Sequence, residues 1–401
     1  MEVKPGYKRT EVGAIPEEWL AKSLGELGKW KGGMTPSMRN PDYWLNGTIP
    51  WISSGDMKFV HLKETGSYIT NEAVKHGSTT MLPAGSIVMV TRSGILRKYL
   101  PVATNLIPMA INQDIKALLL KNELSSSFIL HAITESGPRI LSQCMKSGTT
   151  VESIEFKWLK AFFLAIPPLP EQRAIATVLS DIDELLNSLD RIIAKKRDLK
   201  QAAMQQLLTG QKRLPGFSGE WVLKRLGDIA HVSKGAQLKS DLTDEAGKFA
   251  HLNGGITPSG YTDKSNTDGN TIAISEGGNS CGFVQFMTQP YWCGGHCYSV
   301  IHDGVDNHFL YQALKGRQSE IMGLRVGSGL PNVQKTGLIN FKIHLPKSAA
   351  EQIAIAEVLT KMDDELSTLM VRRDKTSVLK QGMMQELLTG RTRLVALKEA
   401  A

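Results

Sequence analysis

Two carboxylates and a lysine near the N-terminus could hold a metal ion for phosphodiester cleavage. Asp42 lies in "NPDYW", and Asp56 and Lys58 lie in "SGDMK". Carboxylate oxygens are ligands that magnesium prefers, and nucleases use bound metal ions to activate water. The spacing is loose, and "WISSGDMK" also reads as a strand that enters a turn. The sequence therefore favours a turn over a metal site.

A group of thiols and imidazoles in the second half of the chain could hold zinc. Its members are Cys281, Cys293, His296, Cys297 and His302. Structural zinc sites usually take pairs of cysteines separated by two residues, and this group lacks such a pair. We therefore predict buried free thiols, and neither a metal nor a cofactor in this chain.

Two short motifs resemble enzyme signatures but lack the element that each signature requires. "NPDYW" differs by one letter from the Asn-Pro-Pro-Tyr box of adenine methyltransferases, and no glycine-rich nucleotide loop stands beside it. "GNSCG" at 278–282 has the spacing of a nucleophile elbow, but the strand-like "FVQFMTQPYW" follows where a helix is needed. A P-loop is also lacking, so the sequence predicts no catalytic residue.

Side chains suited to nucleic-acid recognition gather in two glycine-rich loops. In the first half, "VTRSGILRKY" places Arg92, Ser93, Arg97 and Lys98 at one turn. Arginine can bind a guanine edge through two hydrogen bonds, and lysine can bind phosphate. The alternative is that these are ordinary solvated loop residues.

The corresponding loop of the second half has different chemistry. "ISEGGNSCG" places Glu276 where Arg92 would be, with Asn279 nearby. Glutamate can accept a hydrogen bond from cytosine, and asparagine can pair with adenine. We therefore expect the two loops to read different bases, with further DNA contacts from Lys58, Lys264 and Lys335.

Composition bounds the class of protein. The 401 residues carry 47 basic and 39 acidic side chains, a net charge of +8 that suits a polyanionic partner without proving one. Four cysteines are too few for a secreted disulfide scaffold. The N-terminus lacks a signal-peptide core, and no apolar run is long enough for a membrane span. We expect a cytoplasmic protein.

A long internal repeat organises the chain. "EQRAIATVLS" begins at Glu171 and "EQIAIAEVLT" begins at Glu351, and 22 of the 44 residues that follow from these two points are identical. So long a period indicates two copies of a domain. Each copy opens with a tryptophan in a short helix-like phrase, "EEWLAKSLGELG" or "GEWVLKRLGDIA". Short β-branched segments then predict a mixed α/β globule.

Each copy ends in a predicted helix of roughly 39 residues, about 58 Å long at 1.5 Å per residue. Gly210 and Gly390 are placed to terminate these helices. An apolar stripe of that length needs a partner, so we expect the helices to pair antiparallel as a coiled coil. The apolar positions expected to pair them are Ile175, Leu179, Ile182, Leu186, Leu189, Ile193, Ile355, Leu359, Met362, Leu366 and Leu369.

These phrases together resemble the specificity subunit of type I restriction–modification systems over essentially the whole chain. The resemblance rests on "PLPEQRAIATVLSDID", "AAEQIAIAEVLTKMDDEL", the two "LLTG" phrases, "IPWISSGDMK" and "AINQDIKAL". It implies two target recognition domains that each read half of a split double-stranded DNA site, with paired helices as a spacer. The subunit itself would not be a catalyst. Its modification subunits, two of them, would methylate adenine from S-adenosylmethionine, and restriction subunits would use ATP and magnesium.

The expected domain order is an α/β (α+β) pseudo-twofold repeat. It places recognition domains at 1–168 and 211–346, long helices at 169–210 and 347–390, and a tail at 391–401. A metal-dependent nuclease and a bivalent protein scaffold that does not bind DNA are the alternative functions. A scaffold would lack the steep salt dependence that phosphate contacts impose.

Overall fold

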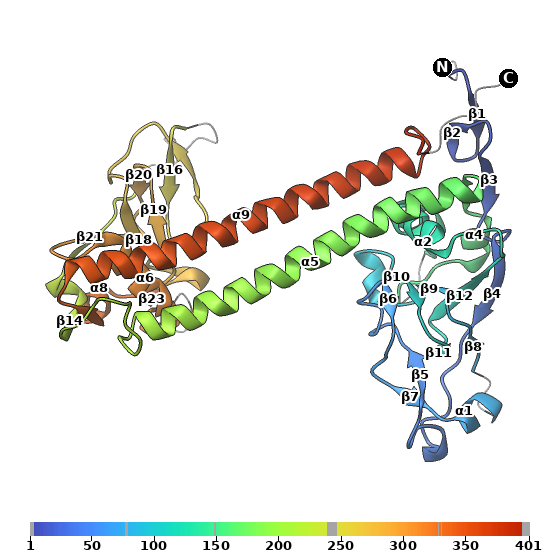
Figure 1. The fold of residues 1–401 in the computed structure, drawn as a ribbon, viewed down its shortest axis with the longest axis horizontal. Helices are drawn as coiled ribbons and strands as arrows, with labels where there is room; N and C mark the ends of the chain where they lie inside the picture. Colours follow the sequence, from blue (N-terminus) through green and yellow to red (C-terminus); the bar gives the residue numbers. More distant parts are fainter. Residues whose placement is uncertain are drawn as a thin grey trace. The chain divides into compact units, whose positions relative to one another are not determined.

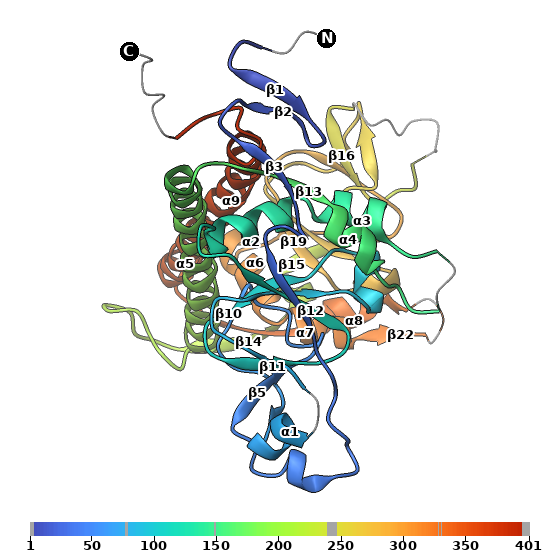
Figure 2. The ribbon, with the colours of Figure 1, turned by 90° about the vertical axis from the view of Figure 1, so that its right-hand side faces the viewer.

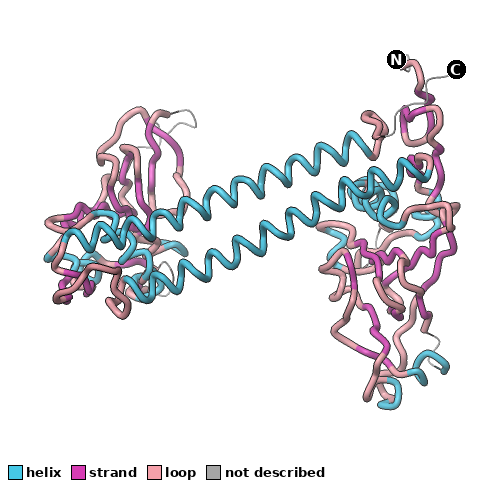
Figure 3. The backbone as a smooth tube through the Cα atoms, in the orientation of Figure 1, coloured by secondary structure: helices cyan, strands magenta, loops and turns pink. Residues whose placement is uncertain are grey.

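The computed structural model describes residues 4–76, 79–147, 150–238, 247–327, 329 and 331–394. Contacts divide the chain into two units, Met1–Ser188 with Arg373–Ala401, and Leu189–Arg372. Each unit holds one globular part, one end of helix α5 (Leu169–Leu207) and one end of helix α9 (Ala349–Leu387). Both globular parts mix strands with helices (Figure 3), which is the predicted fold class. Of the predicted tail, residues 395–401 lie outside the described ranges.

The globular part of the first unit contains two main sheets. A five-stranded sheet has the order β4 (Gly28–Gly32), β12 (Ile115–Leu120), β9 (Ile87–Val90), β10 (Val102–Asn105) and β6 (His61–Leu62). A four-stranded sheet has the order β7 (Tyr68–Ile69), β5 (Ile49–Ile52), β11 (Met109–Ile111) and β8 (Met81–Leu82). Two strand pairs complete it, β1 (Tyr7–Thr10) with β2 (Gly13–Pro16) and β3 (Leu20–Ser23) with β13 (Phe163–Ile166).

The central strand β9 is buried along its whole length, which explains its unbroken apolar run "IVMV". The helices of this part are α1 (Asn71–His76), α2 (Ser126–Glu135), α3 (Gly137–Cys144) and α4 (Phe156–Ala161). Helix α2 packs against β10 (Figure 2), and its Phe128 is fully buried in the core. The inner strands β9 and β12 are therefore held in place by a packed core.

The second unit repeats this plan. A four-stranded sheet has the order β15 (Ala230–Lys234), β21 (Cys297–His302), β18 (Thr271–Ser275) and β19 (Val284–Met287), which matches β4-β12-β9-β10. The other strands are β17 (Gly260–Thr262), β16 (Phe249–Leu252) and β20 (Tyr291–Cys293) in one sheet, β14 (Trp221–Arg225) paired with β24 (Lys342–Pro346), and β22 (Arg325–Val326) paired with β23 (Asn332–Val333). The helices are α6 (Asn307–Gly316), α7 (Gln318–Gly323) and α8 (Lys335–Ile339).

A strand follows Trp19 directly and another begins at Trp221, so the helix-like interpretation of "EEWLAKSLGELG" and "GEWVLKRLGDIA" is wrong. Leu20–Ser23 pairs antiparallel with Phe163–Ile166, and Trp221–Arg225 pairs antiparallel with Lys342–Pro346. In each unit this pairing joins the start of the copy to the strand just before the long helix. A long-range partner strand has overridden local helix propensity.

Both long helices end as predicted, with glycine in the left-handed region. Gly210 has φ 74° and Gly390 has φ 73°. An added Cβ at Gly210 would lie 3.1 Å from the Trp221 ring, and one at Gly390 would lie 2.6 Å from Pro16. Only glycine suits both the backbone conformation and the space. Of the helices in the described ranges, none has both the length and the apolar composition that a membrane crossing requires.

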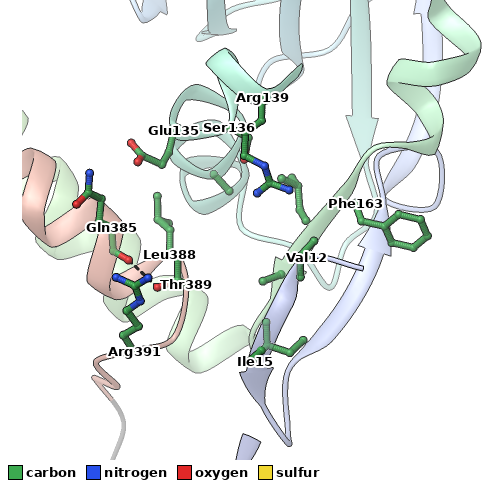
Figure 4. A pocket seen from close by; sticks show the side chains of 14 residues that line it. Val12, Ile15, Glu135, Ser136, Arg139, Phe163, Gln385, Leu388, Thr389 and Arg391 are labelled. Carbon is green, nitrogen blue, oxygen red and sulfur yellow. Dashed lines mark hydrogen bonds between the residues drawn. The ribbon is translucent and has the colours of Figure 1, made fainter. Parts of the chain in front are cut away.

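The two units differ where helix α2 of the first and helix α6 of the second end. In the first unit a cavity of about 320 Å³ opens between the β1–β2 hairpin, α2 and the end of α9 (Figure 4). Its lining includes Glu135, whose pKa is raised by burial, and Arg139. In the second unit the residue that matches Glu135 at the end of α6 is Gly316, and an added Cβ there would lie 3.1 Å from Leu208. Leu208 and Met204 therefore crowd the position at which the first unit has the Glu135 side chain.

Candidate nucleic-acid interface

Arg92 lies just beyond the end of the first sheet at which β9 finishes and β12 begins; we call this end of the strands the sheet edge. The amide of the preceding residue, Thr91, donates to the Asp114 carbonyl at 2.8 Å, and Arg92 forms an isolated bridge with Ser153. Ser93 then caps a short 3₁₀ turn, because its hydroxyl accepts from the Ile95 amide. The backbone at the loop is thus held from both sides, and the Arg92 side chain is exposed.

The other basic residues of this loop differ in their availability. Arg97 is paired with Glu152 through a short ion pair that lowers the pKa of the Glu152 carboxyl. Lys98 follows the turn and is exposed. Because Arg97 already has an acidic partner, it would have to exchange that partner to bind a phosphate. Arg92 and Lys98 carry the more accessible charges of the predicted set.

A hollow beside Arg92 contains residues that the sequence analysis did not identify. Its lining includes Gln113, Lys116, Lys146 and Phe156. The Lys116 ammonium lies 5.8 Å from the centre of the Phe156 ring, and Lys146 lies 3.2 Å from Glu155. We call Arg92, Gln113, Lys116, Lys146 and Phe156 the first hollow. The phrase "NQDIK", which runs from the loop after β11 into β12, could have pointed to these residues, because it places an amide and a cation at the start of a strand.

The second unit has a carboxylate at the matching sheet edge. The Glu276 amide donates to the His296 carbonyl at 2.9 Å, and its carbonyl accepts from the Val333 amide at 2.8 Å. Thr91 makes the same two bonds, to Asp114 and from Ile154. Thr91 is therefore the equivalent of Glu276, and our expectation that Glu276 takes the place of Arg92 is wrong by one residue. The apolar strands of the two copies can be aligned from sequence, but the residues just beyond the strand ends cannot.

The Glu276 carboxylate is engaged by side chains from the neighbouring strands. Lys234 of β15 lies 2.7 Å from it, and the Tyr298 hydroxyl of β21 donates to it at 3.0 Å. His296 lies 3.6 Å away and is mostly exposed. Burial, together with the Glu276 charge, raises the pKa of Tyr298, so this hydroxyl stays protonated. Glu276 is an oriented acceptor rather than a freely moving loop residue.

The remaining candidates lie on exposed turns. Asn279 lies in the 3₁₀ turn after Glu276, and Lys335 begins α8, which follows directly on β23. Lys264 lies in the loop after β17, and Lys58 lies in the turn after β5. All four side chains are exposed. Asn279 belongs to the same sheet edge as Glu276, whereas Lys58 and Lys264 lie on other loops.

The patterns that suggested enzymatic chemistry have structural roles. The Asp56 carboxylate accepts from the Ser53 amide at 2.8 Å and the Gly66 amide at 2.7 Å, which closes a turn. Asn40 caps the turn that contains Asp42. Ser280 is followed by strand β19, as its flanking sequence predicts. Across the described ranges, no three His, Cys, Asp or Glu side chains meet as metal ligands. The cysteines of the zinc pattern, Cys281, Cys293 and Cys297, are free and buried.

In each unit the segments of α5 and α9 run antiparallel (Figure 1). In the first unit Lys380 lies 2.6 Å from Asp183, and in the second unit Lys196 lies 2.6 Å from Glu365. Lys200 also pairs with Asp363. The residues predicted to pair the helices are all buried or half-buried. Those nearest each helix start, Ile175, Leu179, Ile355 and Leu359, also belong to the core of the adjacent globular part.

The duplicated "EQ" phrase anchors each helix to its globular part, a role that sequence reasoning missed. Glu171 is 1% exposed, accepts from the Trp19 indole at 3.0 Å and is paired with Arg393 at 2.6 Å. Glu351 is fully buried and binds Arg213 through two hydrogen bonds. In the first unit Arg393 follows the end of α9 and Glu171 lies in the first turn of α5. In the second unit Arg213 follows the end of α5 and Glu351 lies in the first turn of α9.

The adjacent glutamines repeat the anchoring. The Gln172 amide donates to the Pro167 carbonyl at 2.8 Å and accepts from the Ser125 amide at 2.9 Å. The Gln352 amide donates to the Pro346 carbonyl and accepts from the Asp306 amide, both at 2.8 Å. Ser125 and Asp306 are the N-caps of α2 and α6. The two "EQ" phrases therefore make the same contacts between a long helix and its globular part in both units; we call each set of contacts a joint.

Comparison with known proteins identifies relatives of this repeated architecture. A family model described as "Type I restriction modification DNA specificity domain" matches residues 16–196 and 218–375. The chain is 42% identical over 195 residues to the "Type I restriction enzyme EcoR124I/EcoR124II specificity subunit" of Escherichia coli. That match covers 49% of this chain and 46% of that protein, so the chain spans about half the length of this relative.

Other similarities extend along the whole chain. The "Type I restriction enzyme EcoprrI specificity subunit" of Escherichia coli is 24% identical over 392 residues, which cover 92% of this chain and 94% of that protein. The crystal structure of a type I restriction–modification S subunit from M. genitalium matches with a TM-score of 0.69 and 20% identity, covering 97% of this chain and 98% of that one. The structural match supports the fold of both units.

Proposed function

The chain belongs to the type I restriction–modification DNA specificity family, and we propose that it recognises DNA sequence, with each of its globular parts reading one half of a bipartite double-stranded site. The observation that carries this proposal is duplication. The family domain occurs twice in one chain, and each copy contains one globular part with its following helix.

The loop chemistry supports separate readers with different preferences. The first hollow presents cations, whereas the equivalent edge of the second unit presents the Glu276 carboxylate. Arginine and lysine suit the acceptor-rich edge of guanine, and a carboxylate suits the amino group of cytosine. Two readers with the same fold thus offer different hydrogen-bonding groups to DNA.

The paired helices are proposed to set the number of unread base pairs between the half-sites. Each helix has 39 residues, about 58 Å at 1.5 Å per residue. Ion pairs between α5 and α9 hold the register of the two helices within each unit. A pair of helices in fixed register is stiffer than a single helix, which suits it to act as a spacer.

The partners and chemistry of the complex are part of the same proposal. We propose that the chain is a non-catalytic subunit that binds modification subunits, two of them, and through them restriction subunits. S-adenosylmethionine, ATP and magnesium would be used by those partners. Val378 and Leu379 are exposed apolar side chains on α9. They support protein docking along the helices, because a bound partner would remove this apolar surface from water.

Sequence selection from a pool of random DNA duplexes tests this function directly. The chain, co-expressed with its modification partner, is expected to enrich a split motif with a constant gap. Affinity is expected to fall steeply with salt. Binding without any motif, or binding that salt does not weaken, would favour a protein scaffold. Magnesium-dependent cleavage by the chain alone would favour a nuclease.

Arg92→Ala provides the first residue-level check. We expect it to weaken binding by about 1–3 kcal/mol and to relax preference at one position of one half-site. The other half-site contains different contacts and should be unchanged. Unaltered affinity and preference would remove Arg92 from the recognition residues.

A further inference from the structure

The two sheet edges can be compared residue by residue, because their strand registers match. Lys116 of β12 pairs with Met89 and with Gly32. Tyr298 of β21 pairs with Ile274 and with Lys234. Since Thr91 and Glu276 are equivalent, Lys116 is the equivalent of Tyr298, and Gly32 is the equivalent of Lys234.

In the second unit these three positions form one hydrogen-bonded network. Lys234 and Tyr298 both bind the Glu276 carboxylate, at 2.7 Å and 3.0 Å. The positive charge at this edge is thereby satisfied within the protein. The carboxylate is held by a cation and a hydroxyl from the two strands beside it.

In the first unit the same positions leave a cation without a carboxylate. The equivalent of Glu276 is Thr91, and the equivalent of Lys234 is Gly32. An added Cβ on Gly32 would lie 2.8 Å from the Lys116 ammonium, so the lysine occupies the space that the glycine leaves. Among the described residues, Lys116 makes no ion pair, and its ammonium faces the Phe156 ring within the first hollow.

We propose that Lys116 is a specificity-determining residue of the first recognition domain, which reads the acceptor-bearing edge of a guanine beside Arg92. This inference rests on the proposed function and extends it to a residue and a base. The guanine O6 and N7 atoms supply the acceptors that Glu276 supplies to Lys234 in the other unit. Arg92 and Lys116 line the same hollow, so both can reach neighbouring acceptors in a major groove.

The adjacent residues of the first hollow have supporting roles. Lys146 is already paired with Glu155, and Gln113 shares a short hydrogen bond with Thr35. The Phe156 ring, which packs edge-on against Trp30 at 5.4 Å between centroids, contacts the Lys116 ammonium. These contacts restrict where the Lys116 ammonium can lie. Restricting a long side chain before binding reduces the entropy lost when DNA arrives.

The test is sequence selection with three variants of the full chain, each co-expressed with the modification partner. Lys116→Ala is expected to lose guanine preference at one position of the first domain's half-site, with about tenfold weaker binding to the wild-type site. Lys116→Gln is expected to move that preference toward adenine, because glutamine pairs with the adenine N6 and N7 atoms. Lys121→Ala, one residue beyond the far end of the same strand, is the matched control and should behave as wild type.

Each outcome decides the inference. A shift to adenine in Lys116→Gln supports it, because a purely structural role would not change which base is preferred. Weaker binding to all sequences alike, with a smaller salt slope, would make Lys116 a phosphate contact and overturn the inference. An unchanged motif and affinity would also overturn it. If the wild-type chain selects no split motif, the proposed function itself fails, which is a separate result.

Discussion

At the scale of residues, Trp19, Glu171 and Arg393 form a buried polar joint in the first unit. Glu171 is almost completely buried and is compensated by Arg393 and the Trp19 indole. The Arg393 side chain also lies 2.9 Å from Glu18. A buried carboxylate needs such compensation, because its desolvation is costly. Removing the partner leaves the cost in place.

Arg393→Ala is therefore expected to destabilise the first unit by about 3 kcal/mol, since breaking a buried pair strands the remaining charge. Urea unfolding of the full chain, followed by the fluorescence of its tryptophans, measures the loss. Arg391→Ala is the matched control, two residues away, because its pair with Glu386 is exposed on both sides. Equal effects of the two substitutions would contradict the importance of the joint.

At the scale of elements, helix α2 buries a histidine where both long helices meet the first core. His131 is 6% exposed, and burial lowers its pKa to about 4. The charged and titratable groups that act on it are Asp183 of α5, Lys380 of α9 and His61 of β6. Asp183 and Lys380 are themselves an ion pair. The packing of three helices therefore depends on a neutral imidazole.

Stability of the first unit should fall as pH drops through the range from about 6.5 to 4. The unfolded chain binds a proton at His131 in that range and the folded chain does not, so acid favours unfolding. Between pH 6.5 and 5.5 the expected loss is about 1 kcal/mol. Urea midpoints at the two values measure it. His131→Leu should flatten this dependence, and an unchanged slope in that variant would assign it to other groups.

How much the sequence reveals depends on the kind of contact. The long helices follow from an apolar stripe and a terminal glycine, both local signals, and the structure has them from Leu169 and Ala349 onward. The strands after Trp19 and Trp221 were mistaken for helices, because their partners lie more than a hundred residues away. Lys116 was overlooked for the same reason. Its neighbours in the hollow come from loops and from the start of helix α4, which only the folded domain brings together.

At the scale of the whole molecule, two helices that run through both units carry the proposed spacing. Within the second unit, Lys196 and Lys200 of α5 oppose Glu365 and Asp363 of α9. A change in the length of one helix alone would break these pairs. A matched change in both would preserve them, which separates the effect of length from the effect of register.

A paired insertion of seven residues tests the spacer. Placed between Lys195 and Lys200 in α5, and between Asp363 and Thr368 in α9, it adds about 10.5 Å of helix. At 3.4 Å per base pair we expect the gap between half-sites to change by about three base pairs. Mapping methylated adenines in host DNA measures the gap. The same insertion in α5 alone is the control and should impair assembly, whereas an unchanged gap with the paired insertion would end the spacer proposal.

The division of the chain also bears on how it is made. The second unit is one continuous stretch, Leu189–Arg372, and can fold while the ribosome is still at work. The first unit, although most of it is synthesised earlier, includes Met384 and Leu387 of α9 and the following Leu388 in its core, and Arg393 pairs with its Glu171. The residues up to Arg393 must therefore be synthesised before the core of the first unit is complete. A chain truncated just before Met384 would keep every residue of the second unit's core and lack these three residues of the first unit's core.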